Sequence, residues 1–188
     1  MSKNIEKAKR LDSDERKKIL NPDQILPLFN ISRGKILADI GCGTGYFSIP
    51  IAKMIGEEGK VFAIDVDNDM LLVLSEKVAK EGINNIEFIL SKEYNFIIED
   101  DIADYALIAN VLHEIEDKRR FLDEAKRILK SNGVLFIIEW QKKETTFGPR
   151  FEERIDIDEC INLLKTCGFS DCNFYVINDY FYLVKCFK

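Results

Sequence analysis

Short, predominantly apolar runs alternate with helical patterns through most of this chain. Strands that are apolar on both faces need cover on both faces, which is typical of a parallel sheet with helices on each side. The last two runs have only Asn178-Asp179 between them, which leaves no room for a crossover helix and predicts an antiparallel hairpin. We therefore expect an α/β fold with a seven-stranded, mostly parallel sheet. The predicted strands cover residues 35–40, 61–64, 86–90, 103–109, 134–138, 172–177 and 180–186.

Capping and stop residues divide the remaining segments into helices. Ser13, with two acids in the first turn, predicts a helix to about residue 20. Asn21-Pro22 predicts a cap and a helix over residues 22–29. Pro50 is expected to shift or kink the start of a helix over 46–55. The other predicted helices run from a cap at Asn68 to Gly82, from Asp117 to Asn132-Gly133, and from Asp156, with Glu159 as a capping-box-like partner, to Gly168.

The length of 188 residues favours one domain. We divide it into an N-terminal helical arm, residues 1–30, and a main domain, residues 31–188. The arm is rich in lysine and arginine, and two readings of it stay open. It could form a lid, through Arg10, Leu11 and Arg16, or it could be a solvated amphipathic helix.

Composition argues against several partners. A net charge of −6 argues against a dominant surface for nucleic acids or anionic membranes, because both are polyanions. No apolar run is long enough to span a bilayer, and the first thirty residues lack the apolar stretch of a secretory leader. We therefore expect a cytoplasmic enzyme. The cysteines are odd in number and lack C-x-x-C spacing, which predicts reduced thiols and no metal site: Cys42, Cys160, Cys167, Cys172 and Cys186.

A glycine-rich loop, Gly41-Cys42-Gly43-Thr44-Gly45, lies between the first strand and the next helix. A triphosphate-binding loop would end in Gly-Lys-Ser/Thr, and the lysine is missing here. A dinucleotide fingerprint would need glycine at position 46, which is Tyr46. The pattern D-x-G-x-G-x-G fits in full, starting at Asp39. A carboxylate repels a pyrophosphate but suits the ammonium of a methionine group.

Asp65 ends the second strand, twenty residues after Gly45. A carboxylate there can accept hydrogen bonds from both hydroxyls of a ribose. The same feature serves dinucleotides and S-adenosylmethionine, and a strand-end aspartate with a purely local role is the alternative. Ligands of open α/β sheets bind beyond the carboxyl ends of the strands, which is where this loop and Asp65 fall.

These motifs resemble those of class I S-adenosylmethionine-dependent methyltransferases, and most closely the small-molecule branch of the ubiquinone and menaquinone biosynthesis type. The resemblance covers about residues 35–170. Its motifs here, in order, are Ala38-Asp39-Ile40-Gly41-Cys42-Gly43-Thr44-Gly45, Ala63-Ile64-Asp65, Asp104-Tyr105-Ala106-Leu107, Asn110-Val111-Leu112-His113 and Leu129-Lys130-Ser131-Asn132-Gly133.

The resemblance implies a Rossmann-like sheet of order 3-2-1-4-5-7-6 and S-adenosylmethionine as the cofactor, with S-adenosylhomocysteine as its product. It also implies the ligand contacts. The family often has Gly-Asp-Ala near adenine, where this chain has Ser91-Lys92-Glu93, so adenine recognition departs from the family pattern. The implied cofactor-binding residues are Asp39, Gly41, Cys42, Gly43, Gly45, Asp65, Val66, Lys92, Glu93, Asn110 and Val111.

Few side chains near the expected strand ends can assist chemistry. Methyl transfer from a sulfonium needs mainly alignment, and a base helps only if the acceptor must lose a proton. His113 and Glu139 are the candidate catalytic residues, although His113 could instead pack or cap beside Glu114. Trp140 and the loop 141–154 could wall an acceptor pocket, or the loop could be a plain surface connection.

The expected activity is methyl transfer to a small molecule by direct displacement. Two alternatives stay open: a methyltransferase acting on protein or RNA, and a module that binds S-adenosylmethionine or S-adenosylhomocysteine without catalysis. The Asp/Asn-Pro-Pro-aromatic signature of nucleic-acid amino methyltransferases is missing after Ala109, where Asn110-Val111-Leu112 stands. Tyr46 argues against a nicotinamide oxidoreductase.

Overall fold

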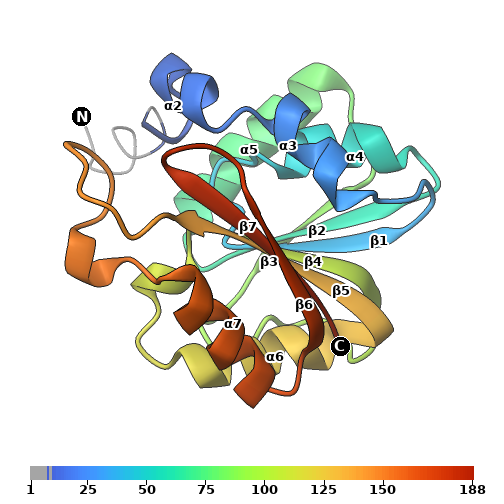
Figure 1. Cartoon of the computed structure of the whole chain (residues 1–188). Helices are drawn as coiled ribbons and strands as arrows, with labels where there is room; N and C mark the ends of the chain where they lie inside the picture. The colour runs from blue at the N-terminus through green and yellow to red at the C-terminus, as the bar shows by residue number, and fades with distance from the viewer. Residues whose placement is uncertain (1–7, 9) are drawn as a thin grey trace. The chain divides into compact units, whose positions relative to one another are not determined.

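The computed structural model describes residue 8 and residues 10–188. Seven strands form one sheet of order β3-β2-β1-β4-β5-β7-β6, which confirms the predicted order. Figure 1 labels the strands, which are β1 Ile36–Ile40, β2 Lys60–Asp65, β3 Ile86–Leu90, β4 Ala103–Ala109, β5 Leu129–Trp140, β6 Ser170–Val176 and β7 Phe181–Phe187.

The strands pair as the apolar pattern predicts. β1 with β2, β2 with β3, and β4 with β5 are parallel. β7 is antiparallel to both β5 and β6, which confirms the C-terminal hairpin. Parallel strands need crossover connections, and the helices between them supply these.

The chain divides into two compact units, Met1–Ile97 and Ile98–Lys188, called here the N-terminal and C-terminal units. In the N-terminal unit, α4 and α5 pack on β2 and β3, and α3 packs on α4. The helices of this unit include α2 Asp14–Ile19, α3 Pro22–Phe29, α4 Ser48–Ile55 and α5 Asn68–Glu81.

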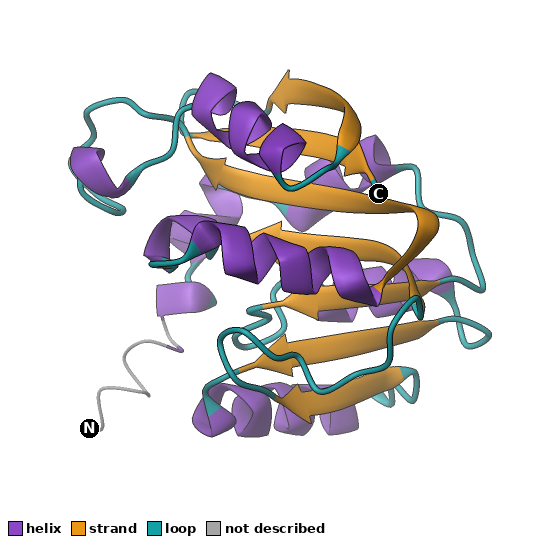
Figure 2. Cartoon of the chain, turned by 90° about the horizontal axis from the view of Figure 1, so that it is seen from below, coloured by secondary structure: helices purple, strands orange, loops and turns teal. Residues whose placement is uncertain are grey.

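In the C-terminal unit, α6 packs on β5, and α7 packs on β6 and β7. Figure 2 shows these two helices side by side in front of the strands of the unit. Two short 3₁₀ turns also belong to this unit. η1 follows β4, and η2 precedes α7. The bounds are η1 Leu112–Glu114, α6 Lys118–Ile128, η2 Phe151–Glu153 and α7 Ile157–Thr166.

Most helix starts follow the predicted caps. The side chains of Ser13, Asn21, Asp117 and Asp156 each accept a hydrogen bond from a backbone N–H of the first turn. One cap was misplaced by a residue, because Asp67 caps α5 and Asn68 is its first helical residue.

Two element boundaries differ from the prediction. The helix expected from residue 46 begins at Ser48, which places Pro50 in the first turn, where its missing N–H breaks no helical hydrogen bond. The helix expected to run to Asn132-Gly133 ends at Ile128, and β5 starts at Leu129. Backbone pairing of Leu129 with Ala103 extends the strand backwards, so Asn132, at φ 65°, lies within a strand irregularity.

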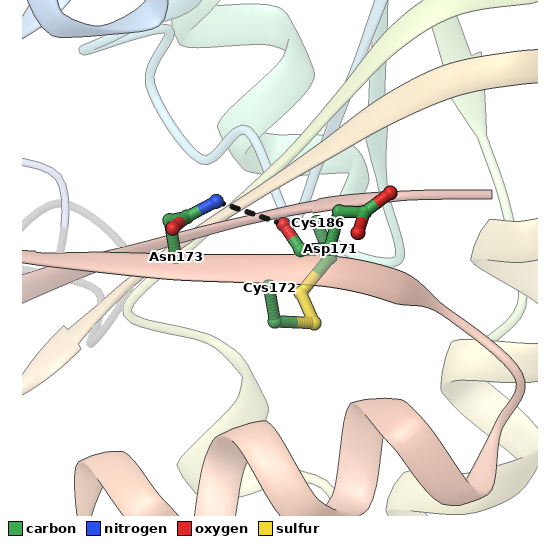
Figure 3. The surroundings of a disulfide bond; sticks show 4 residues. All are labelled: Asp171, Cys172, Asn173 and Cys186. Carbon is green, nitrogen blue, oxygen red and sulfur yellow. Dashed lines mark hydrogen bonds between the residues drawn. A yellow bond between two sulfur atoms is a disulfide. The ribbon is translucent and has the colours of Figure 1, made fainter.

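The expectation of reduced thiols is wrong for two cysteines. Cys172 of β6 and Cys186 of β7 form a disulfide with a Cα–Cα distance of 4.2 Å (Figure 3). The antiparallel hairpin brings these residues together across the irregularity between Ser170 and Asn173 of β6. Cys42, Cys160 and Cys167 are buried free thiols.

None of the helices described here combines the length and the apolar character needed to cross a membrane.

Candidate functional site

The glycine loop follows β1 and depends on backbone shapes that suit glycine. Gly41, Gly43 and Gly45 all have positive φ. At Gly45 a Cβ atom would lie 2.1 Å from Cδ1 of Leu74, so the loop packs directly against α5. The backbone N–H groups of Gly41 and Cys42 both bond to the carbonyl oxygen of Ile64 in β2. The positive φ at all three positions and the close approach of Leu74 at Gly45 favour glycine there.

Asp65 is joined to the glycine loop by a hydrogen bond. Its Oδ2 accepts from the backbone N–H of Gly43 at 2.7 Å, and its Oδ1 accepts from the N–H of Asp67 at 2.9 Å. Each carboxylate oxygen has a second lone pair available for a hydroxyl donor. The strand-end acid and the loop therefore form one polar unit.

Asp39 lies in β1 below the loop and is only 2% exposed. Its Oδ2 accepts from the hydroxyl of Ser48 at 2.5 Å. Burial raises the pKa of this carboxyl to about 7. The hydrogen bond from Ser48 lowers the pKa, and the negative charge of Asp65 raises it. A cation placed beside such a carboxyl favours its ionised form.

Cys42 serves the core in this structure. Its side chain packs with Ala63, Leu71 and Leu74, and burial raises the pKa of the thiol well above its usual value. Any part it takes in ligand binding falls to its backbone. Val66, by contrast, is 59% exposed beside Asp65 and offers apolar surface there.

Lys92 and Glu93 are exposed and are not brought to the glycine loop by any contact described. Lys92 exchanges backbone hydrogen bonds with Asn95 in a local turn. Ser91 is the residue next to the site, because its N–H bonds to the carbonyl oxygen of Asp65 at 2.9 Å.

The N-terminal arm is fastened to the loop by residues that sequence reasoning did not single out. Asp12 accepts a hydrogen bond from the Thr44 hydroxyl at 2.8 Å and an ion-paired one from Lys77 of α5 at 2.5 Å. Lys77 also donates to the backbone oxygen of Thr44 at 2.9 Å. The Asp12–Lys77 pair spans 65 positions, so no local pattern could reveal it.

Arg16, one of the three residues named in the lid reading, lies beside the loop. Its guanidinium carbon is 4.2 Å from the centroid of the Tyr46 ring, and its Nη1 donates to the backbone oxygen of Leu11 at 2.9 Å. The Tyr46 hydroxyl in turn donates to the backbone oxygen of Leu20 at 2.7 Å. Leu11 also reaches the loop, since a Cβ on Gly43 would lie 3.3 Å from its Cδ1. Arg10, the third residue of the lid reading, is exposed.

In the C-terminal unit, the two predicted catalytic residues meet. His113 Nδ1 lies 2.8 Å from Glu139 Oε2, and the backbone N–H of His113 donates to Glu139 Oε1 at 3.2 Å. Glu139 is fully buried at the end of β5. Burial lowers the pKa of the His113 ring, but the hydrogen bond and charge of Glu139 outweigh it, so the pKa is raised. His113 Nε2 also lies 3.8 Å from Glu114 Oε1, the neighbour named in the packing or capping alternative.

Asn110 has a strained backbone at the end of β4. Its φ is 57°, and its N–H donates to Ile138 at 2.8 Å. Its side-chain oxygen is buried and has no hydrogen-bond partner among the described residues. Such an atom is costly unless a ligand donor satisfies it. Val111 follows as the residue just before the η1 turn, and its carbonyl oxygen accepts from the N–H of Glu114.

The loop 141–154 is ordered around Arg154, which is 3% exposed. The Arg154 guanidinium lies 5.3 Å from the Trp140 ring centroid, and Trp140 packs against Phe147 and Phe181. These contacts give the loop a defined conformation. Arg154 donates to the backbone oxygens of Gln141, Lys143, Phe147 and Pro149 and to the hydroxyl of Thr145.

Comparison with known proteins supports one family. The demethylmenaquinone methyltransferase of Geobacillus stearothermophilus is 31% identical over 126 residues, covering 67% of this chain and 53% of that protein. The ubiquinone/menaquinone biosynthesis C-methyltransferase UbiE of Marinomonas sp. (strain MWYL1) is 32% identical, covering 61% and 46%. The chain thus spans about half the length of the curated relatives it matches.

A solved structure matches almost the whole chain. The SAM dependent methyltransferase from Aquifex aeolicus is 33% identical, with a TM-score of 0.91 and 97% of both chains covered. The model of the ubiE/COQ5 methyltransferase family matches residues 16–152, which include the glycine loop, Asp65 and the His113–Glu139 pair. This chain belongs to the ubiE/COQ5 methyltransferase family.

Proposed function

We propose that this protein is an S-adenosylmethionine-dependent methyltransferase that acts on a small molecule. The observation that carries the proposal is the 2.7 Å hydrogen bond from the Gly43 N–H to Asp65, which joins the D-x-G-x-G-x-G loop to the strand-end acid. Family membership and the near-complete match to a SAM dependent methyltransferase support it.

The residues of the N-terminal unit fit this cofactor. Asp65 retains acceptor capacity for two ribose hydroxyls, and exposed Val66 can lie against an apolar base. Asp39 supplies a buried negative charge suited to an ammonium group and unsuited to a phosphate. Adenine recognition by Lys92 or Glu93 stays a prediction, as do methionine contacts from Asn110 and Val111, where the unpaired Asn110 oxygen favours a ligand donor.

When bound, S-adenosylmethionine supplies a methyl group on a positively charged sulfur. The chain's own contribution to chemistry is the His113–Glu139 pair. A carboxylate at this distance acts as a hydrogen-bond acceptor, so Glu139 favours the tautomer of His113 that carries hydrogen on Nδ1 and leaves Nε2 free of hydrogen. His113 can then take a proton from the molecule that receives the methyl group, and Glu139 stabilises the imidazolium that forms.

We infer a phenol-like acceptor, such as a reduced quinone, because loss of a hydroxyl proton makes its ring a better nucleophile. The names of the matched relatives support this class. In the C-terminal unit, the aromatic cluster of Trp140, Phe147 and Phe181 offers flat apolar surface next to Glu139. A cytoplasmic location and the absence of a nucleic-acid partner stay predictions.

Isothermal titration with S-adenosylhomocysteine and with NAD tests the cofactor assignment. We expect S-adenosylhomocysteine to bind and NAD not to bind. Asp65→Ala should weaken binding by roughly ten- to a hundredfold, since hydrogen bonds to charged groups contribute about 1.5–3 kcal/mol each. Asp67→Asn is the matched control, because Asp67 caps α5 and asparagine caps a helix equally well, so affinity should be retained.

Binding of NAD alone would refute the assignment. Transfer of labelled methyl groups from S-adenosylmethionine to reduced naphthoquinones then separates an enzyme from a module that only binds. Tight binding with no transfer to any extract or quinol would favour the binding module.

A further inference from the structure

A cation beside the glycine loop is left without an anionic partner. Arg16 sits over the Tyr46 ring, one residue beyond Gly45. Among the described residues, the one hydrogen bond of its guanidinium runs from Nη1 to the Leu11 carbonyl. Within the part of the chain that the structure describes, no carboxylate forms a salt bridge with it. A guanidinium carries five N–H donors, so most of its donors remain available.

The surroundings of Arg16 disfavour an unpaired cation. Burial lowers the pKa of its guanidinium against the attraction of Tyr46, Asp12 and Asp39. A partly desolvated charge that no opposite charge pairs by hydrogen bonding is unfavourable, and an anionic ligand would relieve that cost.

Three contacts hold Arg16 in place. The hydroxyl of Ser13 accepts from its N–H at 3.2 Å, and the Leu11 carbonyl and Tyr46 ring hold the guanidinium. Asp12 fixes the preceding turn to Thr44 and Lys77. A side chain that is already ordered loses little entropy when it binds a ligand.

The ligand needs a matching pair of charges. Asp39, below the same loop, is a buried carboxyl whose charge interacts with that of Arg16, although the two form no salt bridge. Two opposite charges that do not pair with each other suit a zwitterionic ligand. Its ammonium can pair with Asp39 and its carboxylate with Arg16. The amino-acid half of S-adenosylmethionine is such a group.

We propose that Arg16 of the N-terminal arm binds the carboxylate of the cofactor's amino-acid half. This inference rests on the proposed function and adds a binding residue to it. It also gives the arm, residues 1–30, a part in selecting the ligand rather than only in covering it. A guanidinium can hold a carboxylate through two parallel hydrogen bonds, which a lysine cannot reproduce.

The test removes the carboxylate from the ligand and the guanidinium from the protein. Titrations compare S-adenosylhomocysteine with its decarboxylated analogue, which keeps the ammonium, and with 5′-methylthioadenosine, which lacks the amino-acid half. Wild type should prefer S-adenosylhomocysteine over the decarboxylated analogue by roughly ten- to a hundredfold. Arg16→Met should bind both of these ligands alike and should bind 5′-methylthioadenosine as wild type does.

Two further variants complete the design. Lys17→Met, on the exposed side of the same helix, should keep the full preference, because Lys17 makes only an exposed 3.5 Å pair with Asp14. Arg16→Lys should keep a reduced preference, and it preserves the test if Arg16→Met fails to fold.

Three outcomes are separable. A full preference retained in Arg16→Met, or an equal loss for all three ligands in that variant, would overturn the inference. The first result would place carboxylate recognition elsewhere, and the second would make Arg16 purely structural. A wild type that binds none of the three ligands would instead refute the proposed function.

Discussion

Asp39 links the protonation of one buried carboxyl to both stability and ligand binding. Its pKa is raised from 3.8 to about 7 by burial, with the charge of Asp65 adding to the effect. Below pH 3.8 the group is protonated in both the folded and unfolded chains. As the pH rises from 3.8 to about 7, the unfolded chain releases this proton first, so the folded state loses stability. Above that window the penalty is constant.

Asp39→Asn removes that penalty while it keeps an oxygen to accept from Ser48. We expect the variant to be more stable than wild type by roughly 1–3 kcal/mol at about pH 8, and the gain to shrink toward about pH 4. Urea unfolding across this range measures it. The same variant should bind S-adenosylhomocysteine more weakly, and its affinity should lose the rise with pH that wild type shows near neutrality. A stability difference that does not change with pH would contradict the assignment.

The His113–Glu139 pair has the opposite chemistry, because here the charged form is stabilised. Burial opposes the charge on His113, but Glu139 outweighs burial and raises its pKa above the usual 6.5. The resulting stabilisation is fully present below that unfolded value and disappears as the pH rises through the raised pKa. We expect the gap in unfolding free energy between wild type and His113→Gln to be larger at about pH 5.5 than at about pH 9.

Glu139→Gln serves as the comparison for this pair. It removes the charge that raises the pKa, so His113→Gln in that background should give a gap that no longer falls with increasing pH. Equal gaps at both pH values in wild type would show that the pair carries no net charge coupling.

Among the elements, the loop 141–154 depends most on one side chain. Arg154→Met would leave four backbone oxygens and the Thr145 hydroxyl without their donor. We expect a loss of about 2–4 kcal/mol in unfolding free energy and faster proteolysis within residues 141–153. Arg150→Met is the matched control, since exposed Arg150 bonds only to Glu153 and should change little. Equal protease resistance in both variants would refute this role of Arg154.

The elements themselves could be predicted because their signals are local. Apolar runs and caps such as Ser13 and Asp117 act over three or four residues, and the structure confirms them. Asn132-Gly133 misled the prediction because strand pairing with β4 overrides the turn preference of those residues. Tertiary pairing of this kind leaves no mark in a short window of sequence.

The site divides in the same way. The glycine loop and Asp65 were predicted from a contiguous pattern, and the structure joins them. Sequence reasoning named His113 and Glu139 singly, but their 2.8 Å contact spans 26 positions. The ion pair between Asp12 and Lys77 joins residues 65 positions apart and was not predicted. Side-chain partners that distant depend on the complete fold.

For the molecule as a whole, the cysteine count was a poor guide. An odd number of cysteines leaves at least one thiol free but does not forbid a pair. What decides the matter is the antiparallel pairing of β6 with β7, which brings Cys172 and Cys186 together with Cα atoms 4.2 Å apart. The remaining three cysteines are each buried without a partner cysteine.

The disulfide acts on the whole chain because it restricts the unfolded ensemble. With 14 residues separating the two cysteines, loop closure is expected to contribute about 3 kcal/mol to stability. The Cys172→Ser/Cys186→Ser double variant should lose about that amount, and reductant should destabilise wild type while leaving the double variant unchanged. Thiol titration in denaturant without reductant supplies an independent measure, since wild type should expose the three free thiols of Cys42, Cys160 and Cys167. Five titrating thiols, or a wild-type midpoint that reductant does not move, would show that the hairpin folds without the bond and that its pairing alone holds β6 in place.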